Sequence, residues 1–259
     1  MMTNGGTQPN KRLVTMGWDP ESKQYLTAAW DTYSEHIILQ ILGLGHPDPK
    51  KRLPPDAWLA WKRQVVNLSN GEKFLGGDLP LFAHQYPWMW LDPKQIKIDG
   101  IDPFENSKLA TVRDHDLSQK DPRLSRFGIW GLSASDSAAP EGYRAFRHGD
   151  GEKDPGDNVG TVCPGCVAAS MVYDKEMVLP YLSSLMTGPF KNKIVGQYGF
   201  VDAFNLSKDW SGEDSLAITI APVYMSSAHM EDGSIWKTFL NIESIQKGIE
   251  AARSQEKPF

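Results

Sequence analysis

The stretch that most constrains the fold is 30–42, an apolar run that also contains two carboxylates, Asp31 and Glu35. Its apolar residues recur at the spacing of one helix face, at Trp30, Tyr33, Ile37, Ile41 and Leu44. The stretch therefore predicts a helix over 30–42 that packs this face inward. On that helix Asp31 and Glu35 lie four residues apart, where two like charges are slightly destabilising. The pair indicates either a solvated polar edge or a functional site.

The composition describes an ordinary soluble globular chain of 259 residues, with 23% charged residues and a net charge of -5. The longest basic cluster is only 49–52, so we expect no nucleic-acid partner. The first ten residues lack the apolar core of a signal peptide, and no stretch approaches the roughly 18 apolar residues of a membrane span. We therefore expect no membrane partner, and the sequence leaves the compartment open.

Further helical patterns follow along the chain, at 54–70, 103–116, 164–171, 175–186, 213–229 and 234–252. Pro87 is expected to interrupt any regular helix in 81–92. No sustained strand alternation appears, and long aromatic loops join the helices. This pattern predicts an all-α fold of helical hairpins, with a cleft at the loop ends.

Many aromatic residues stand in polar loops that are rich in glycine and proline. Flat rings of this kind stack on the apolar faces of sugars, while neighbouring polar groups bind the hydroxyls. Most aromatic side chains belong to a core in any protein, and this alternative stays open. The loop residues that we would place at a cleft include His84, Gln85, Tyr86, Trp130, Asp136, Glu141, Tyr143, Arg147, Asp202 and Phe204.

The two cysteines, Cys163 and Cys166, form a Cys-Pro-Gly-Cys motif. No second pair of Cys or His residues lies at the spacing of a zinc site. A redox pair is one interpretation, and small residues in a tight loop are the favoured one. The sequence predicts neither a metal nor a cofactor.

Five motifs occur in order: Trp30-Asp31-x-Tyr33-Ser34-Glu35, His84-Gln85-Tyr86, 130–137 (WGLSASDS) with Gly142-Tyr143, Gly160-Thr161-Val162-x-Pro164, and 198–205 (YGFVDAFN). In this order they resemble the glucoamylase-like (glycoamylase) domain family, which includes bacterial endo-β-1,2-glucanases and a part of cyclic β-1,2-glucan synthases. The resemblance covers about 15–242.

The resemblance implies an α/α toroid of six helical hairpins, with a sugar cleft at one end and acid/base hydrolysis of a β-glucan. Glu35 matches the family's general acid, and its apolar neighbours would keep the carboxyl protonated. The residues that we then expect to bind the oligo- or polysaccharide are Asp31, Tyr33, His84, Gln85, Tyr86, Trp130, Tyr143, Arg147 and Phe204.

One departure from the family pattern concerns the catalytic base. Thr219 stands where the family has an aspartate, and a threonine hydroxyl cannot take a proton from water at neutral pH. Asp202 and Asp136 are the next candidates for the base. The alternative is a catalytically inactive carbohydrate-binding or partner-binding module. If Thr219 does replace the base, turnover should be low and Thr219→Asp should raise it.

The other departure concerns length, because only about thirty residues precede the motif that contains Glu35. We therefore expect an incomplete toroid, closed by a second copy or by another subunit. The expected organisation is a flexible segment over 1–14, the α/α domain over 15–252 and a flexible tail over 253–259.

Overall fold

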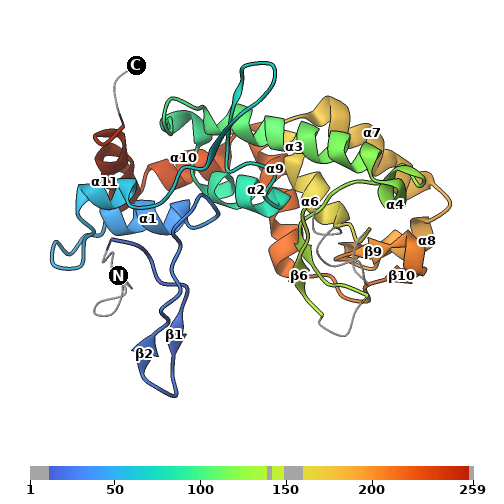
Figure 1. Ribbon diagram of the computed structural model, residues 1–259, viewed down its shortest axis with the longest axis horizontal. Coiled ribbons are helices and arrows are strands. Elements are labelled where there is room, and N and C mark those ends of the chain that lie inside the picture. Colours follow the sequence, from blue (N-terminus) through green and yellow to red (C-terminus); the bar gives the residue numbers. More distant parts are fainter. Residues whose placement is uncertain (1–11, 139–141, 149–159, 257–259) are drawn as a thin grey trace. The chain divides into compact units, whose positions relative to one another are not determined.

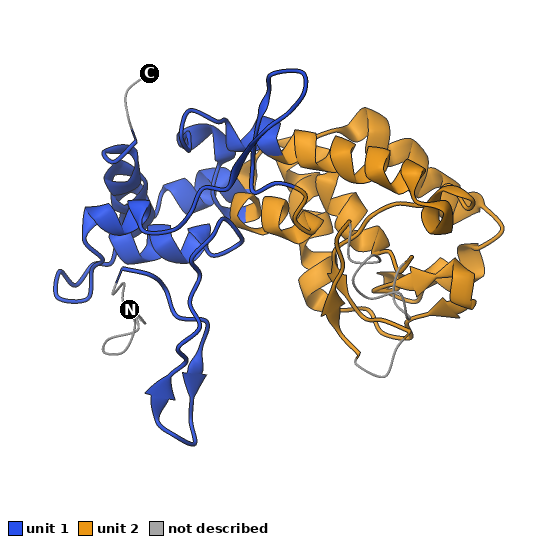
Figure 2. Ribbon diagram, viewed as in Figure 1, with its two compact units in different colours: residues 1–77, 90–106, 235–259 blue, residues 78–89, 107–234 orange. Residues whose placement is uncertain are grey.

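The computed structural model describes residues 12–138, 142–148 and 160–256 (Figure 1). Helices dominate it, and its strands are only two or three residues long, so the prediction of a helical chain is confirmed. The chain divides into two compact units (Figure 2). Unit 1 comprises residues 1–77, 90–106 and 235–259, and unit 2 comprises residues 78–89 and 107–234.

Unit 1 combines short helices with antiparallel hairpins. Its helical elements are α1 (Ile37–Leu44), η1 (Pro55–Leu59), η2 (Pro93–Gln95), α10 (Ser234–Leu240) and α11 (Glu243–Arg253). The hairpins pair β1 (Trp18–Asp19) with β2 (Gln24–Tyr25), and β3 (Val65–Asn67) with β4 (Lys73–Leu75).

Unit 2 carries the longer helices. Its helical elements are α2 (Leu81–Trp90), α3 (Pro103–Lys120), α4 (Pro122–Ser125), α6 (Pro164–Ala168), η3 (Ala169–Val172), α7 (Lys175–Thr187), α8 (Lys191–Ile194), η4 (Leu206–Lys208) and α9 (Ala217–Glu231). Antiparallel strand pairs join β5 (Ala134–Ser135) to β6 (Arg144–Ala145), β7 (Val195–Gly196) to β8 (Gly199–Phe200), and β9 (Phe204–Asn205) to β10 (Trp210–Ser211).

In unit 1, α1 and α11 pack closely because glycines stand where they meet. A Cβ atom at Gly248 would lie 2.1 Å from the carbonyl oxygen of Ile41, and one at Gly45 would lie 1.6 Å from that of Ser244. Any side chain at either glycine would push the two helices apart. The apolar side chains buried on these helices are Ile37, Ile41, Leu44, Ile245 and Ile249.

In unit 2, the core forms around α6 and α7. The Asp174 side chain caps α7 by accepting a hydrogen bond from the Met177 backbone N–H at 3.1 Å. Helix α7 then packs against α6 and η3. This core contains Leu124, Ile129, Trp130, Leu132, Val167, Val178, Leu182, Leu185 and Phe204.

The helix predicted over 30–42 is wrong at its start, because α1 begins only at Ile37. Residues 31–33 interact with Lys62 instead, and the residues from 33 to 36 form bends and a turn. The Tyr33 N–H donates to the Lys62 carbonyl oxygen at 3.0 Å, and the Lys62 N–H donates to the Asp31 carbonyl oxygen at 2.7 Å. Asp31 and Glu35 therefore do not form the helical pair that their spacing suggested.

Other helix predictions also needed correction. Residues 54–70 form η1 followed by β3, because Val65 and Val66 favour a strand and Asn70-Gly71 favours a hairpin turn. Pro87 does not interrupt the helix, since α2 continues through it to Trp90. The helix predicted over 234–252 is divided into α10 and α11. The helices predicted over 103–116, 164–171, 175–186 and 213–229 correspond to α3, α6 with η3, α7 and α9.

Both described ends of the chain are packed within unit 1. Val14 is buried. The Glu256 carboxylate accepts hydrogen bonds from Trp58 Nε1 at 2.6 Å and from the Asp99 N–H at 2.8 Å. Residues 1–11 and 257–259 of the segments predicted to be flexible lie outside the described residues.

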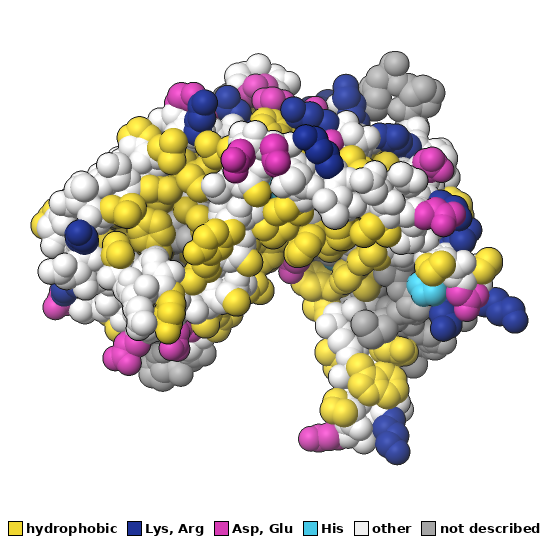
Figure 3. All heavy atoms as spheres, turned by 180° about the vertical axis from the view of Figure 1, so that it is seen from behind, with side chains coloured by type: hydrophobic (Ala, Val, Ile, Leu, Met, Phe, Trp, Pro, Cys, Tyr) yellow, Lys and Arg dark blue, Asp and Glu magenta, His cyan; other side chains and the backbone are white. Residues whose placement is uncertain are grey.

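Hydrophobic side chains are exposed over much of the face shown in Figure 3. On the β1–β2 hairpin, the rings of Trp18 and Tyr25 pack edge to face with their centroids 4.8 Å apart. Ile218 and Tyr224 are exposed on α9. Within the described ranges, we find no helix that combines the length and the apolar character needed to cross a membrane.

Candidate functional site

Glu35 lies in the turn just before α1, and its carboxyl is half-buried. Burial is the main cause that raises the pKa of Glu35, while hydrogen bonds from its own backbone and from Ser34 act in the opposite direction. A carboxyl with a raised pKa keeps its proton to higher pH. Glu35 thus has the property that a general acid needs.

Aromatic rings surround the histidine next to Glu35. The His36 ring lies parallel to Trp30 at a centroid distance of 6.1 Å and meets the edge of Trp61 at 5.5 Å. Burial, together with the nearby Arg63 charge, lowers the pKa of His36 to about 3. His36 is therefore uncharged at neutral pH and does not provide a cation that would favour ionisation of Glu35.

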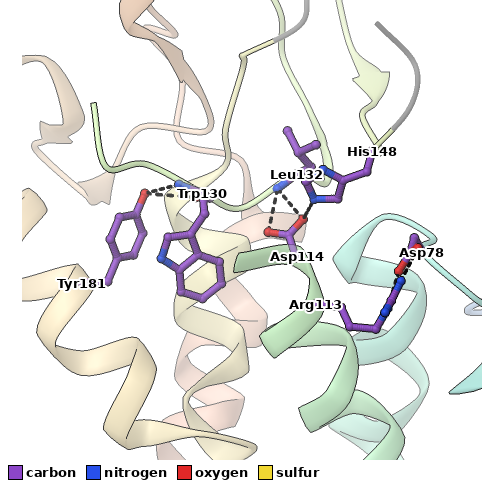
Figure 4. A network of polar contacts seen from close by, with 7 residues as sticks. All are labelled: Asp78, Arg113, Asp114, Trp130, Leu132, His148 and Tyr181. Carbon is purple, nitrogen blue, oxygen red and sulfur yellow. Dashed lines mark hydrogen bonds and ion pairs between the residues drawn. The ribbon is translucent and has the colours of Figure 1, made fainter. Parts of the chain in front are cut away.

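In unit 2, a polar network holds the segment that leads to Asp136 (Figure 4). The Tyr181 hydroxyl donates to the Trp130 carbonyl oxygen at 3.0 Å and accepts from the Trp130 N–H at 3.2 Å. The Asp114 carboxylate accepts from the Leu132 N–H at 3.3 Å and contacts His148 Nε2 at 2.9 Å. Side chains of α3 and α7 thereby fix the backbone a few residues before Asp136.

Asp136 and Asp202 are linked directly. Asp202 is almost completely buried, and its Oδ2 accepts a hydrogen bond from the Asp136 backbone N–H at 2.7 Å. Its Oδ1 accepts from the Thr219 hydroxyl. Both carboxylate oxygens of Asp202 are therefore occupied inside unit 2, whereas Asp136 is partly exposed.

Two neighbouring carboxylates act on Asp136. Burial raises its pKa most, and the charges of Asp202 and Asp214 raise it further. Burial and the charges of Asp202 and Asp136 likewise raise the pKa of the Tyr143 phenol. Asp214 was missed in the sequence, where only the acidic turn before α9 could have indicated it. Its carbonyl oxygen accepts the Asp202 N–H at 3.0 Å.

Several residues predicted to bind substrate have too little exposed surface to do so in this structure. Gln85 is one example, because its amide donates to the Cys166 carbonyl oxygen at 2.8 Å and to the Ser170 hydroxyl at 2.7 Å. Asp202, predicted as catalytic, is also too buried to contact a substrate directly. The predicted substrate-binding residues that are buried are Tyr33, His84, Gln85, Trp130 and Phe204.

The other predicted binding residues are accessible. Asp31 is exposed and forms an ion pair with Lys62 at 3.7 Å. Tyr86 is half-buried and donates its hydroxyl hydrogen to the Ile218 carbonyl oxygen at 3.1 Å. Tyr143 and Arg147 are exposed on the segment that includes β6, while Glu141 lies outside the described residues. Of the four residues predicted to group at one cleft, His84 and Trp130 are buried, whereas Tyr86 and Tyr143 are accessible, and the grouping stays a prediction.

Cys163 and Cys166 form a disulfide at the start of α6. Both cysteines are buried, and the Cys163 side chain caps the helix. Across the described ranges, no group of three His, Cys, Asp or Glu side chains is arranged to hold a metal ion.

Comparison with known proteins assigns this chain to a family. The Glycoamylase family model, described as "Putative glucoamylase", matches residues 27–243. Among curated proteins, the chain is 29% identical over 199 residues to an exo-β-1,2-glucooligosaccharide sophorohydrolase (non-reducing end) of Parabacteroides distasonis. That match covers 72% of this chain and 26% of the relative, so the chain spans about a quarter of the relative's length.

Solved structures show the same fold. A "putative glucoamylase" from Bacteroides uniformis superposes with a TM-score of 0.81 at 26% identity, over 97% of this chain and 61% of that chain. An endo-β-1,2-glucanase from Chitinophaga pinensis gives a TM-score of 0.76 at 22% identity, over 94% and 60%. The predicted α/α-toroid fold class is confirmed by this likeness. The expectation that the toroid is incomplete stays a prediction.

Proposed function

Since the chain belongs to the Glycoamylase family, we propose that it acts on a β-glucan as a glycoside hydrolase, with β-1,2-glucan as the expected substrate. The family match carries this proposal. The name of the curated relative, a β-1,2-glucooligosaccharide sophorohydrolase, supports the linkage. Hydrolysis would use one protonated carboxyl and one carboxylate, as in most glycoside hydrolases.

Glu35 is the proposed general acid. Its raised pKa favours the protonated form that must deliver a proton to the departing sugar oxygen. The uncharged His36 beside it adds no positive charge that would release this proton early.

Asp136 is the proposed general base, in preference to Asp202. Asp136 is partly exposed and can reach a water molecule, whereas the oxygens of Asp202 are occupied by Thr219 and by the Asp136 backbone. The negative charges around Asp136 also raise its affinity for a proton, which strengthens a base once it is ionised.

The accessible polar residues are the proposed saccharide contacts. Tyr143 and Tyr86 offer rings and hydroxyls, and Arg147 and Asp31 offer charged groups for sugar hydroxyls. Asp31 lies in unit 1, and Tyr86, Tyr143 and Arg147 lie in unit 2.

The alternative is a catalytically inactive carbohydrate-binding or partner-binding module. It is favoured by one observation, the threonine at position 219 where the family pattern has its base. Association with a second copy or another subunit also stays a prediction. Sedimentation velocity of the purified chain over a hundredfold concentration range tests it, with a concentration-dependent shift expected.

Incubation of the purified protein with a panel of β-glucans tests the proposed function. We expect new reducing ends from β-1,2-glucan and far fewer from β-1,3- or β-1,4-glucans. Saturable binding of β-1,2-glucan without products would select the inactive module. Neither products nor binding with any glucan would contradict both interpretations.

A further inference from the structure

A buried carboxylate stabilises a protein only when hydrogen bonds or cations replace the water that it has lost. Asp202 is 1% exposed. Among the residues that the structure describes, no Lys, Arg or His forms an ion pair with it. Its side-chain partners there are the Thr219 hydroxyl and the Asp136 N–H. These two hydrogen-bond donors therefore hold the buried carboxylate in place.

The Thr219 hydroxyl is held firmly toward Asp202. Thr219 is 2% exposed on α9, and it lies against Gly165 of α6, where a Cβ atom would be only 2.7 Å from Thr219 Cγ2. The glycine lets the two helices approach so closely. Because the methyl group packs against α6, the hydroxyl is directed to the other side, toward Asp202 Oδ1.

On this geometry, we propose that Asp202 and Thr219 are positioning residues, which fix the backbone of Asp136 and place a negative charge beside its carboxyl. The inference rests on the proposed function, in which Asp136 is the base. Thr219 then contributes to the site by holding the Asp202 carboxylate in position. A threonine at this position does not by itself indicate a lost base.

The electrostatics agree with this arrangement. The groups whose charges raise the pKa of Asp136 are Asp202 and Asp214, and Tyr143 faces the same carboxylates as a neutral phenol. Removal of the Asp202 charge should therefore lower the pKa of Asp136. A purely structural role for Asp202 would leave that pKa where it is.

Asp202→Asn separates the charge from the hydrogen bonds. The asparagine oxygen can accept the Asp136 N–H, and its amide can donate to the Thr219 oxygen, so the fold should be retained. We expect the acid limb of the kcat/KM profile on β-1,2-glucooligosaccharides to move to lower pH. We also expect kcat to fall about threefold to tenfold, because a less basic carboxylate is a weaker general base.

Thr219→Val removes the donor at nearly constant volume, and Thr219→Ser retains it. We expect the valine variant to lose about tenfold or more in kcat with KM little changed, because an unsatisfied buried carboxylate loses its fixed position. The serine variant should keep kcat within about threefold of the wild type. Equal kcat in the valine and serine variants would overturn the role of Thr219.

A titration independent of activity decides the inference even if no glucan is hydrolysed. The carboxyl carbon of Asp136, followed by NMR against pH in the wild type and in Asp202→Asn, reports its pKa directly. A lower pKa in the variant supports the inference, and an unchanged pKa overturns it. Absence of hydrolysis by the wild type would contradict the proposed function alone.

Discussion

Burial is the main cause that raises the pKa of both Glu35 in unit 1 and Asp136 in unit 2, but neighbouring charges add to the shift only at Asp136. Burial alone raises the pKa of Glu35, next to a histidine that burial keeps neutral. The pKa of Asp136 is raised by burial and also by the charges of Asp202 and Asp214. Apolar burial suits an acid that must stay protonated, whereas neighbouring charge suits a base that must bind a proton strongly. The comparison shows that a raised pKa can suit one carboxyl to act as a general acid and another to act as a general base.

The largest expected effect comes from the unit 1 side of this comparison. Glu35→Gln should lower kcat on β-1,2-glucan about 100- to 10,000-fold, because the amide cannot donate a proton to the departing oxygen. The matched control is Glu72→Gln, which makes the same substitution at an exposed glutamate in the turn between β3 and β4. Initial rates of reducing-end release measure both variants. A similar loss in both would show that Glu35 has no special role.

Thr219→Asp tests the residues around Asp136 in unit 2. The sequence suggested that this substitution would raise turnover, and the structure leads us to expect the opposite. A carboxylate at position 219 would face the buried Asp202, and we expect about 3 kcal/mol of lost stability from a second uncompensated buried charge. Turnover should fall with it. Urea denaturation and initial rates measure the two effects. A stable variant with higher turnover than the wild type would mean that position 219 does take the base.

Tyr181→Phe tests how firmly the segment before Asp136 is held. The variant leaves the N–H and the carbonyl of Trp130 without the partner that they share, which should cost about 2 kcal/mol. The control is Asp78→Asn, which breaks a more exposed ion pair to Arg113 and should cost less than about 1 kcal/mol. Denaturation midpoints of both variants check the difference, and equal losses would contradict it.

A smaller effect is expected in the pH dependence of stability. A carboxyl whose pKa is higher in the folded state than in the unfolded state destabilises the folded state once pH exceeds the folded pKa, and has no effect below the unfolded pKa. Asp136→Asn should therefore be more stable than the wild type at pH 7. This gain should disappear as pH falls through the pKa of Asp136. Thermal melts between pH 3 and 8 measure it, and a gain that is independent of pH would contradict the sign.

The sequence correctly predicted the helices that have a local start signal. The 103–116 and 175–186 patterns begin at Asp102 and Asp174, whose side chains accept hydrogen bonds from the first helical turn, and both helices form. The stretch 30–36 has helical spacing, but its residues 31–33 are paired with Lys62, a contact across about thirty residues that local periodicity cannot reveal. Val65 and Val66 likewise joined a strand because a partner was available.

The candidate site was predictable in part. Glu35 and Asp136 were found through motifs, and both are accessible carboxyls with raised pKa. Trp130 and Phe204 were predicted to bind substrate and are buried; an aromatic ring in a polar loop has the same sequence pattern whether it faces a sugar or the core. The role of Thr219 could not be predicted, since its partner Asp202 is distant in sequence and its orientation depends on Gly165.

The most direct test of Glu35 as the acid and Asp136 as the base compares two substrates. Glu35→Gln and Asp136→Asn are assayed on β-1,2-glucan and on dinitrophenyl β-sophoroside, whose leaving group needs no protonation. We predict that Glu35→Gln loses at least about 100-fold on the glucan but recovers most of its rate on the aryl substrate, while Asp136→Asn is slow on both. An equal loss for Glu35→Gln on the two substrates, or recovery only in Asp136→Asn, would contradict the assignment.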